Sequence, residues 1–431
     1  MKVKIQNTEI NIKGEVFAPP SKSYTHRAIA VASLSENAVI KYPLLSADTQ
    51  ATISACTAIG ASIDIKKSEL IINGVCGNPK IPDNVIDVAN SGTTLRFMTA
   101  ISALIDGYTV LTGDSSIRKR PNNPLLKALT ELGAFAISTK NNGTAPIVIR
   151  GTLKGGFCEI SGSISSQFIS GLLLACPFSE KDTEIKIKGE LKSQPYIDIT
   201  LEVLKEADAI INFDSNIPQF TIPCNQEFNL KNYTIPGDFS SASYLLAASA
   251  IAGESEVKIK NLYPSKQGDS AIIPILEKMG ANIEWNKKKG MVCVKKSELN
   301  GITIDVSKTP DLVPTLAVLG AIAKGTTIIE NAEHVRYKET DRLHAMTVEL
   351  SKMGVDISEE KDKLIIKGGN ALTGNKLHGW DDHRIVMALT IAGMVAKGWT
   401  IIDTVESVEV SYPSFFEDIK RLGGEVELIM Q

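Results

Sequence analysis

The chain has 431 residues, of which 43% are hydrophobic and 22% are charged, a composition typical of a soluble globular protein. A formal net charge of −3 argues against a protein that binds nucleic acid or an anionic membrane surface, because such proteins need a surplus of cations. This length exceeds one ordinary hydrophobic core, so we expect two domains of roughly 200 residues each.

The expected compartment is the cytoplasm. The six cysteines are scattered and form no Cys-x-x-Cys pair, which predicts reduced core residues. Residues 1–13 alternate as a β-strand does and lack the apolar segment of a signal peptide. The longest apolar run, at residues 312–323, is too short to cross a bilayer.

Small polar or charged clusters run directly into apolar helical patterns along the whole chain, at intervals of about 70 to 75 residues. They begin at Ser21, Asn90, Ser165, Gly237, Thr309 and Asp381. A second series lies at the far ends of helices, where glycine or a substitute precedes an alternating strand. Its members are Gly60, Gly133, Asp208, Gly280, Gly354 and Gly423. Glycine suits the left-handed residue that closes a helix, so both series predict helix boundaries in six repeated units.

Each predicted unit holds two helices and about four strands, among them residues 184–188, 257–260 and 326–330. Periodicity alone fits a solenoid, a ring or two lobes, and the near-equal split of the chain favours two lobes of three units. Residues 233–237 would close the third unit and start the fourth. The opening strand is then left over and is expected to pair elsewhere.

The heptapeptide Arg336–Arg342 carries three cations and two carboxylates and is followed by apolar residues at helical spacing. This pattern predicts the first turn of an amphipathic helix. Its charges alone fit a solvated helix face equally well. The repetition of similar helix starts favours a shared site.

Helix starts attract anions, because unpaired N–H groups and the positive end of the helix dipole lie there. The cations at or near the predicted starts are Lys22, Arg27, Arg96, Arg120, Lys338, Arg342 and Arg384. The hydroxyl groups that could bind phosphate oxygens, or cap helices instead, are those of Ser23, Ser165, Ser166 and Ser193.

Asp311 and Glu339 stand among these cations. Each could be an ordinary helix-start carboxylate, or could exchange protons with an anionic substrate. His26 and His344 are expected to be surface or packing residues, and His383 a polar helix-start residue. No metal-ligand spacing, phosphate-binding loop or dinucleotide motif occurs, so we expect no metal and no cofactor.

The motifs resemble those of the enolpyruvyl transferase family over the whole chain. They are PSKSYTHR at 20–27, NSGTTLR at 90–96, RP at 120–121, SSQF at 165–168, QPYIDIT at 194–200, GDFSSASY at 237–244, RYKETDR at 336–342 and DHR at 382–384. The resemblance implies an α/β fold of the α+β type with two lobes, each made of three βαβαββ units around a pseudo-threefold axis (an inside-out α/β barrel). The expected lobes are residues 1–15 plus 236–431, and residues 16–235, with the active site in a cleft between them.

The motifs look most like the branch of the family that joins phosphoenolpyruvate to shikimate 3-phosphate, a step of chorismate and aromatic amino acid biosynthesis. The implied products are 5-enolpyruvylshikimate 3-phosphate and phosphate, formed through a tetrahedral intermediate. Members of this family are targets of glyphosate, which competes with phosphoenolpyruvate. We expect a monomer with no nucleic-acid or membrane partner.

By resemblance, Asp311 is the base for the 5-hydroxyl, Glu339 exchanges a proton with the methylene carbon, and Lys22 lies close to both. The implied shikimate 3-phosphate ligands are Lys22, Ser23, Arg27, Ser165, Ser166, Gln167, Ser193, Tyr196, Asp311, His334 and Lys338. The implied phosphoenolpyruvate ligands are Lys22, Gly92, Arg120, Gln167, Arg342 and Arg384.

Two positions depart from the family pattern. Val410 stands where many members have a lysine, and His334 where many have asparagine. A missing cation at residue 410 predicts weaker phosphoenolpyruvate binding than in a lysine-bearing relative. Two alternatives stay open: a transferase acting on UDP-N-acetylglucosamine, although residues 113–120 lack the cysteine common there, and a non-catalytic repeat protein that only binds anions.

Overall fold

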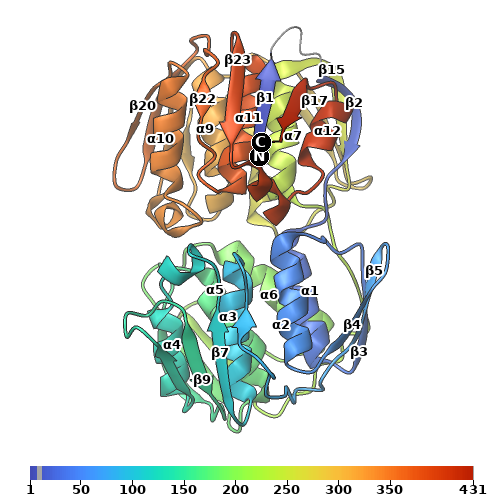
Figure 1. Cartoon of the computed structure of the whole chain (residues 1–431), viewed down its shortest axis with the longest axis vertical. Helices are drawn as coiled ribbons and strands as arrows, with labels where there is room; N and C mark the ends of the chain where they lie inside the picture. The colour runs from blue at the N-terminus through green and yellow to red at the C-terminus, as the bar shows by residue number, and fades with distance from the viewer. Residues whose placement is uncertain (7–11, 431) are drawn as a thin grey trace. The chain divides into compact units, whose positions relative to one another are not determined.

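The computed structural model describes residues 1–6 and 12–430, so the expected strand at residues 1–13 lies partly outside the described residues. The chain forms two compact units (Figure 1). Unit 1 consists of Met1–Pro19 and Pro236–Gln431, and unit 2 of Pro20–Ile235. The chain therefore enters unit 2 after Pro19 and returns to unit 1 at Pro236.

Each unit contains three four-stranded sheets with the same pattern of pairing. One edge strand runs parallel to its neighbour, and the remaining two pairs are antiparallel, as in the order β6-β7-β9-β8. The strands of unit 2 are β3 (Asn37–Lys41), β4 (Ser62–Ile65), β5 (Glu69–Asn73), β6 (Ile86–Asp87), β7 (Tyr108–Thr112), β8 (Phe135–Ser138), β9 (Ile147–Arg150), β10 (Gly156–Ser161), β11 (Thr183–Lys188), β12 (Asn212–Asp214), β13 (Gln219–Ile222) and β14 (Asn232–Thr234). Its α-helices are α1 (Lys22–Leu34), α2 (Ala47–Ala58), α3 (Gly92–Ile101), α4 (Asn123–Glu131), α5 (Ser166–Ala175) and α6 (Gln194–Glu206).

Unit 1 repeats this arrangement in the sheets β2-β15-β17-β16, β18-β19-β21-β20 and β22-β23-β1-β24. Its strands are β1 (Lys2–Gln6), β2 (Ile12–Phe17), β15 (Gly253–Lys260), β16 (Asn282–Asn286), β17 (Met291–Lys295), β18 (Thr303–Asp305), β19 (Gly325–Glu330), β20 (Asp356–Glu359), β21 (Leu364–Gly368), β22 (Lys376–Leu377), β23 (Trp399–Asp403) and β24 (Val426–Ile429). Its α-helices are α7 (Phe239–Ala252), α8 (Ile272–Met279), α9 (Val313–Ile322), α10 (Arg342–Lys352), α11 (His383–Val395) and α12 (Phe415–Arg421). The six βαβαββ repeats expected from the sequence are confirmed.

Strands from distant parts of the sequence complete three of the six sheets, namely β1, β2 and β14. β1 pairs with β23 and β24, which confirms that the opening strand pairs far along the chain. Unit 2 ends at Ile235, within the boundary expected at residues 233–237. These residues do not close the third repeat, because β14 runs parallel to β3 in the first sheet of unit 2. Pairing between distant segments leaves no local sequence signal, so periodicity could not locate this partner.

The helix ends behave as the sequence predicts. Gly60, Gly133, Gly280, Gly354 and Gly423 all have positive φ angles, between 89° and 108°. Asp208, the substitute in the third repeat, also has a positive φ, of 62°. All six positions thus adopt the left-handed conformation that turns a helix into the following strand.

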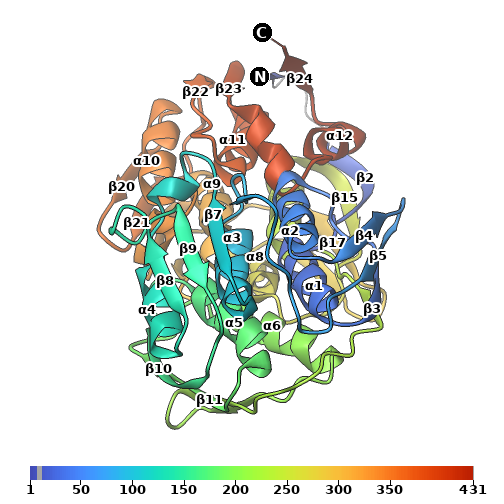
Figure 2. The same ribbon diagram turned by 60° about the horizontal axis from the view of Figure 1, so that its bottom comes forward.

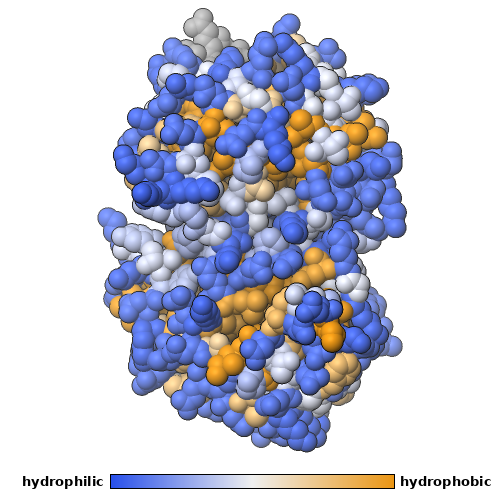
Figure 3. Space-filling model, turned by 180° about the vertical axis from the view of Figure 1, so that it is seen from behind, coloured by the Kyte–Doolittle hydropathy of each residue, from blue (hydrophilic) through white to orange (hydrophobic). Residues whose placement is uncertain are grey.

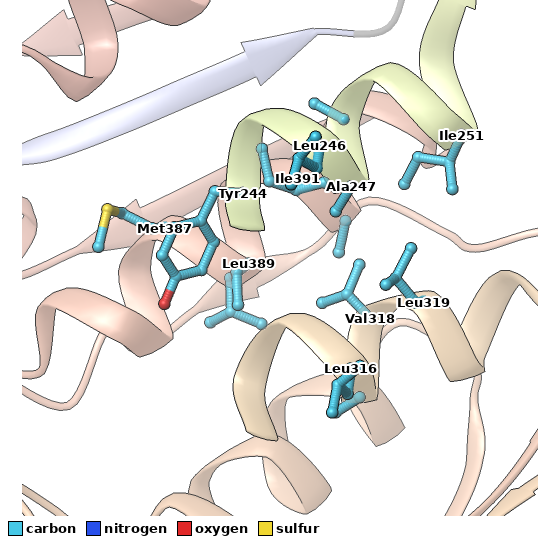
Figure 4. Packing of buried hydrophobic residues seen from close by; sticks show 14 of the residues in the cluster. Tyr244, Leu246, Ala247, Ile251, Leu316, Val318, Leu319, Met387, Leu389 and Ile391 are labelled. Atoms are coloured by element: carbon cyan, nitrogen blue, oxygen red, sulfur yellow. The ribbon is translucent and has the colours of Figure 1, made fainter. Parts of the chain in front are cut away.

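The odd-numbered helices form the interior of each unit. Figure 2 shows α1, α3 and α5 inside unit 2 with its sheets on the outside. In unit 1, every residue of α7 is buried, and Figure 4 shows side chains of α7, α9 and α11 packed against one another, among them Tyr244, Leu316 and Leu389. A helix with buried residues on all sides needs no polar stripe, which explains the nearly continuous apolar sequence of these helices.

The heptapeptide prediction needs a correction. Residues Glu333–Tyr337 form a 3-10 helix, and α10 begins only at Arg342, so most of the charged run precedes the α-helix. Asp341 is the N-cap of α10, and its carboxylate accepts the backbone N–H of His344 at 3.1 Å. A carboxylate in that position stabilises the first turn of the helix.

The remaining expectations concern cysteines and surface. Cys56, Cys158 and Cys176 are buried, but Cys76 is exposed and the other two are half-buried, so only three are core residues; all six are free thiols. Among the described residues, none of the helices combines the length and apolarity required to span a bilayer. The face seen in Figure 3 is mainly hydrophilic, with smaller hydrophobic areas on each unit.

Candidate active site

The expected site residues lie at or near helix starts in both units. In unit 1 they surround Arg342, the first residue of α10, whose side chain is 1% exposed. Its guanidinium donates to Asp382 at 2.8 Å, to Asp311 at 2.9 Å and to Glu339 at 2.5 Å. Burial alone lowers the pKa of Arg342, but the three carboxylates, Asp382 foremost, raise it above its ordinary value. The side chain is therefore a permanent cation fixed by three partners.

Asp311 lies in the single 3-10 turn Pro310–Leu312 that precedes α9. One carboxylate oxygen accepts from Arg342, and the other accepts from Arg384 at 3.0 Å. Lys338 Nζ lies 3.6 Å from the first oxygen. The structure thus brings together five residues that the sequence singled out: Asp311, Lys338, Glu339, Arg342 and Arg384.

Arg336 holds the segment that carries Lys338 and Glu339. Its guanidinium donates to the carboxylates of Asp341 and Glu359, both at 2.7 Å, and to the backbone carbonyls of Glu360 and Lys361. These bonds tie the start of α10 to the end of β20. Arg336 is therefore a structural residue of the heptapeptide rather than a cation available to a ligand.

Sequence reasoning missed Asp382 and Asp269 as partners of this cluster. Asp382 is fully buried, caps α11 and accepts from Arg342. Asp269 is buried and accepts a hydrogen bond from the hydroxyl of Ser240 in α7. Burial first, and then the nearby Asp311, raises the pKa of Asp269 to about 7. Only the fold could place this carboxyl next to Asp311, because the two are 42 residues apart along the chain.

His334 is buried in the 3-10 helix Glu333–Tyr337, and His383 is buried in the first turn of α11. Val410 is half-buried at the end of the 3-10 helix Val405–Val410. Tyr244, in α7, has a pKa raised to about 12 by burial, and Arg384 and Arg342 oppose that shift.

In unit 2, Arg27 lies on α1 and is 2% exposed. Its guanidinium donates to the hydroxyl of Thr200 at 2.7 Å and to the backbone carbonyls of Ser23 and Tyr196, each at 2.9 Å. It also lies over the ring of Phe97, 5.3 Å from the centroid. Burial lowers the pKa of Arg27 to about 10, so the side chain still carries its charge at neutral pH.

Lys22, the first residue of α1, donates from Nζ to Asp48 at 2.9 Å. Both side chains are mostly shielded, with 13% and 7% of their surfaces exposed. Asp48 lies in the first turn of α2. No sequence signal singles out Asp48, since an acidic residue in a first turn is common.

Two arginines converge on the first residue of α3. A Cβ atom built on Gly92 would lie 2.4 Å from Nη1 of Arg96 and 2.8 Å from Nη1 of Arg120. Both arginines are buried, at 5% and 7% exposure. Only a glycine leaves room for two guanidinium groups at this helix start.

The remaining predicted ligands lie at the starts of α5 and α6. Ser165 is the N-cap of α5 and accepts the N–H of Gln167 at 3.3 Å, so its capping role is confirmed. Ser166 is the first, buried residue of that helix. Gln167 donates from its side chain to Thr93 of α3 at 2.9 Å. Ser193 precedes α6 in a left-handed conformation, with φ of 55°.

A sequence model of the family described as EPSP synthase (3-phosphoshikimate 1-carboxyvinyltransferase) matches residues 7–419. The chain belongs to the EPSP synthase family.

Individual relatives agree with this membership. The chain is 61% identical to the 3-phosphoshikimate 1-carboxyvinyltransferase of Methanococcoides burtonii over 100% of both proteins. It is also 61% identical to that of Methanosarcina mazei, over 97% of both. A solved EPSP synthase from Acinetobacter baumannii matches 100% of both chains at 28% identity with a TM-score of 0.85. The predicted family and fold are thus confirmed.

Proposed function

We propose that this protein transfers the enolpyruvyl group of phosphoenolpyruvate to the 5-hydroxyl of shikimate 3-phosphate, with release of phosphate. Family membership over nearly the whole chain supports this activity. The observation that carries the proposal is the cluster in which Asp311 accepts from both Arg342 and Arg384. In this cluster a proton acceptor lies beside two anion-binding groups. Transfer between two anionic substrates requires both kinds of group.

In this proposal, the half-site of unit 1 binds the carboxylate and phosphate of phosphoenolpyruvate through Arg342 and Arg384. Arginine suits this role because its planar fork makes paired hydrogen bonds to such groups. Asp311 takes the proton of the attacking 5-hydroxyl. The bonds from the two arginines orient both carboxylate oxygens, so the base is held in place before the substrate arrives.

Glu339 is proposed to exchange a proton with the methylene carbon of phosphoenolpyruvate. Its carboxylate is held by Arg342, three residues along the chain, and its side chain is 15% exposed. A partly shielded carboxyl keeps access to a substrate while its orientation stays fixed. Lys338, 3.6 Å from Asp311, would bind shikimate 3-phosphate beside the base, with His334 as a further ligand.

The half-site of unit 2 supplies the remaining ligands. We assign Arg27, Ser23, Ser165, Ser166, Ser193 and Tyr196 to shikimate 3-phosphate. We assign Gly92 and Arg120 to phosphoenolpyruvate, and Lys22 and Gln167 to both substrates. Buried cations at helix starts provide the positive potential that binds phosphate groups.

The test is release of inorganic phosphate by the purified protein given shikimate 3-phosphate and phosphoenolpyruvate. Asp311→Asn and Glu339→Gln should each lower kcat by about 100-fold or more, within the range of lost acid–base groups, while shikimate 3-phosphate still binds. Glu298→Gln is the matched control, because Glu298 pairs only at the surface with Lys324. Retention of full rate by either site variant removes that residue from the mechanism.

The outcome of the same assay separates the alternatives. Release with UDP-N-acetylglucosamine instead of shikimate 3-phosphate would assign the chain to the sister activity. No release with either acceptor would leave a protein that only binds anions. A cytoplasmic location and a monomeric state belong to the proposal as well, and light scattering of the purified protein tests the latter.

A further inference from the structure

A chain of buried hydroxyl groups lies beside Lys22 in unit 2. His26 Nδ1 is 2.6 Å from the hydroxyl oxygen of Thr52, which is 2.6 Å from that of Thr94. The Thr94 hydroxyl donates to Ser91 Oγ at 2.7 Å. All four residues are at most 1% exposed. Because Ser91 is the N-cap of α3, the chain connects α1, α2 and the start of α3.

The direction of each hydrogen bond follows from the number of hydrogens. A hydroxyl group carries one hydrogen, and Thr94 uses its own on Ser91. In the short contact between Thr52 and Thr94, the hydroxyl of Thr52 is then the donor. The hydroxyl of Thr52 has no second hydrogen, so in its contact with His26 the donor is Nδ1–H of the imidazole ring.

The ring of His26 is neutral. Its pKa lies well below 6.5, because burial disfavours the charged form and because Lys22 and Arg27 add repulsion. A neutral imidazole has one N–H, so with the hydrogen on Nδ1 the other nitrogen, Nε2, is a bare acceptor.

That nitrogen faces the ion pair of Lys22. Nε2 lies 4.0 Å from Asp48 Oδ2, the oxygen that accepts from Lys22. Within the described residues, neither His26 Nε2 nor Asp48 Oδ1 has a hydrogen-bond partner. Lys22 and His26 thus flank the carboxylate of Asp48 on the side where α1 and α2 meet.

We propose that His26 is a positioning residue: it joins α1 and α2, one turn beyond Lys22 and Asp48, to the start of α3 through the hydroxyl groups of Thr52, Thr94 and Ser91. The inference rests on the proposed function, in which Lys22 and Gly92, near the two ends of this chain, both bind phosphoenolpyruvate. Arg27, a proposed ligand of shikimate 3-phosphate, is held instead by a separate series of hydrogen bonds. Thr200 accepts from Arg27 at 2.7 Å and donates to Ser170 at 2.8 Å.

Valine has nearly the shape of threonine but no hydroxyl group, so a threonine-to-valine substitution in each series of hydrogen bonds distinguishes the two. Thr52→Val removes one hydroxyl and leaves its buried neighbours unpaired, so KM for phosphoenolpyruvate, which both Lys22 and Gly92 are proposed to bind, should rise about tenfold. KM for shikimate 3-phosphate, which shares Lys22 but not Gly92, should rise by a smaller factor. Thr52→Ser keeps the hydroxyl and should restore both values. Thr200→Val is the matched control and should raise KM for shikimate 3-phosphate instead. Equal effects of the two valine variants on both substrates would overturn the proposal.

A second measurement does not depend on activity. In protein labelled with 15N-histidine, the signal lost in His26→Gln should report a neutral ring with the hydrogen on Nδ1 at neutral pH. In Thr52→Val the hydrogen should move to Nε2, because the carboxylate of Asp48 then favours it. A hydrogen on Nε2 in the unsubstituted protein would overturn the inference. If the unsubstituted protein releases no phosphate, the proposed function fails. The NMR signal still decides whether the hydrogen bonds from His26 to Ser91 run in the stated direction.

Discussion

Gly92→Ala is expected to weaken phosphoenolpyruvate binding without unfolding the protein. Gly92 does not have a positive φ angle, so the backbone accepts alanine there. The new methyl group would lie 2.4 Å from Arg96 Nη1 and 2.8 Å from Arg120 Nη1. Both are the far ends of flexible side chains, so they move aside at little cost to the fold.

The size of the effect follows from this displacement. Restoring ordinary contact distances of about 3.5 Å moves the two guanidinium groups by roughly 1 Å each. A misplacement of about 1 Å can cost as much as 100-fold in rate when it affects a positioned group. Loss of one charge-assisted hydrogen bond, about 1.5–3 kcal/mol, corresponds to roughly 10- to 150-fold. We therefore expect KM for phosphoenolpyruvate to rise at least about tenfold.

The assay is phosphate release with each substrate varied in turn, together with thermal unfolding. Gly171→Ala in α5 is the matched comparison, because its methyl group would lie 2.8 Å from the backbone carbonyl of Arg96, which cannot move aside. That variant should lose stability. An unchanged KM for phosphoenolpyruvate in Gly92→Ala would refute the assignment of this helix start to phosphoenolpyruvate binding. A large loss of stability in the same variant would refute the argument that the side chains of Arg96 and Arg120 move aside.

Three further predictions concern unit 1. Asp382→Ala leaves Arg342 without one buried partner and should lower the free energy of unfolding by about 3 kcal/mol in urea, whereas Asp356→Ala, at an exposed pair with Lys367, should change it by less than about 0.5 kcal/mol. Because the pKa of Asp269 is raised to about 7, the folded state binds a proton between pH 4 and 7 that the unfolded chain has released, and this contribution to stability is lost as the pH rises. Relative to Asp269→Asn, the unsubstituted protein should thus lose up to about 1.4 kcal/mol per pH unit in that range; a difference independent of pH would contradict this. Val410→Lys adds a cation where many relatives have one and should lower KM for phosphoenolpyruvate; an unchanged KM would show that the half-buried position does not contact this substrate.

Local sequence signals predicted the parts of the fold that depend on neighbouring residues. The helix ends at Gly60, Gly133 and their counterparts adopt positive φ angles because that conformation is set within one turn. The helix starts at Ser21, Ser91 and Ser165 were found for the same reason, since a cap bonds to N–H groups two or three residues away.

Pairings between distant residues could not be predicted in this way. β14 joins the first sheet of unit 2 although about 190 residues separate it from β3, and no pattern in either strand indicates the other. Asp48, Asp269 and Asp382 were missed as site partners because each is an ordinary acidic residue in its own segment. Each becomes a site partner only because folding brings it close to Lys22, Asp311 or Arg342.

The sequence by itself determined the six repeats, most of the helix boundaries and, through its motifs, the family. These properties depend on local backbone conformation and on residue types, which are written along the chain. The tertiary structure decided which charges meet: Arg342 binds three carboxylates from three different segments, and the hydroxyl chain from His26 crosses three helices. Such contacts are set by how the repeats pack around their buried helices, and packing geometry has no local signature in the sequence.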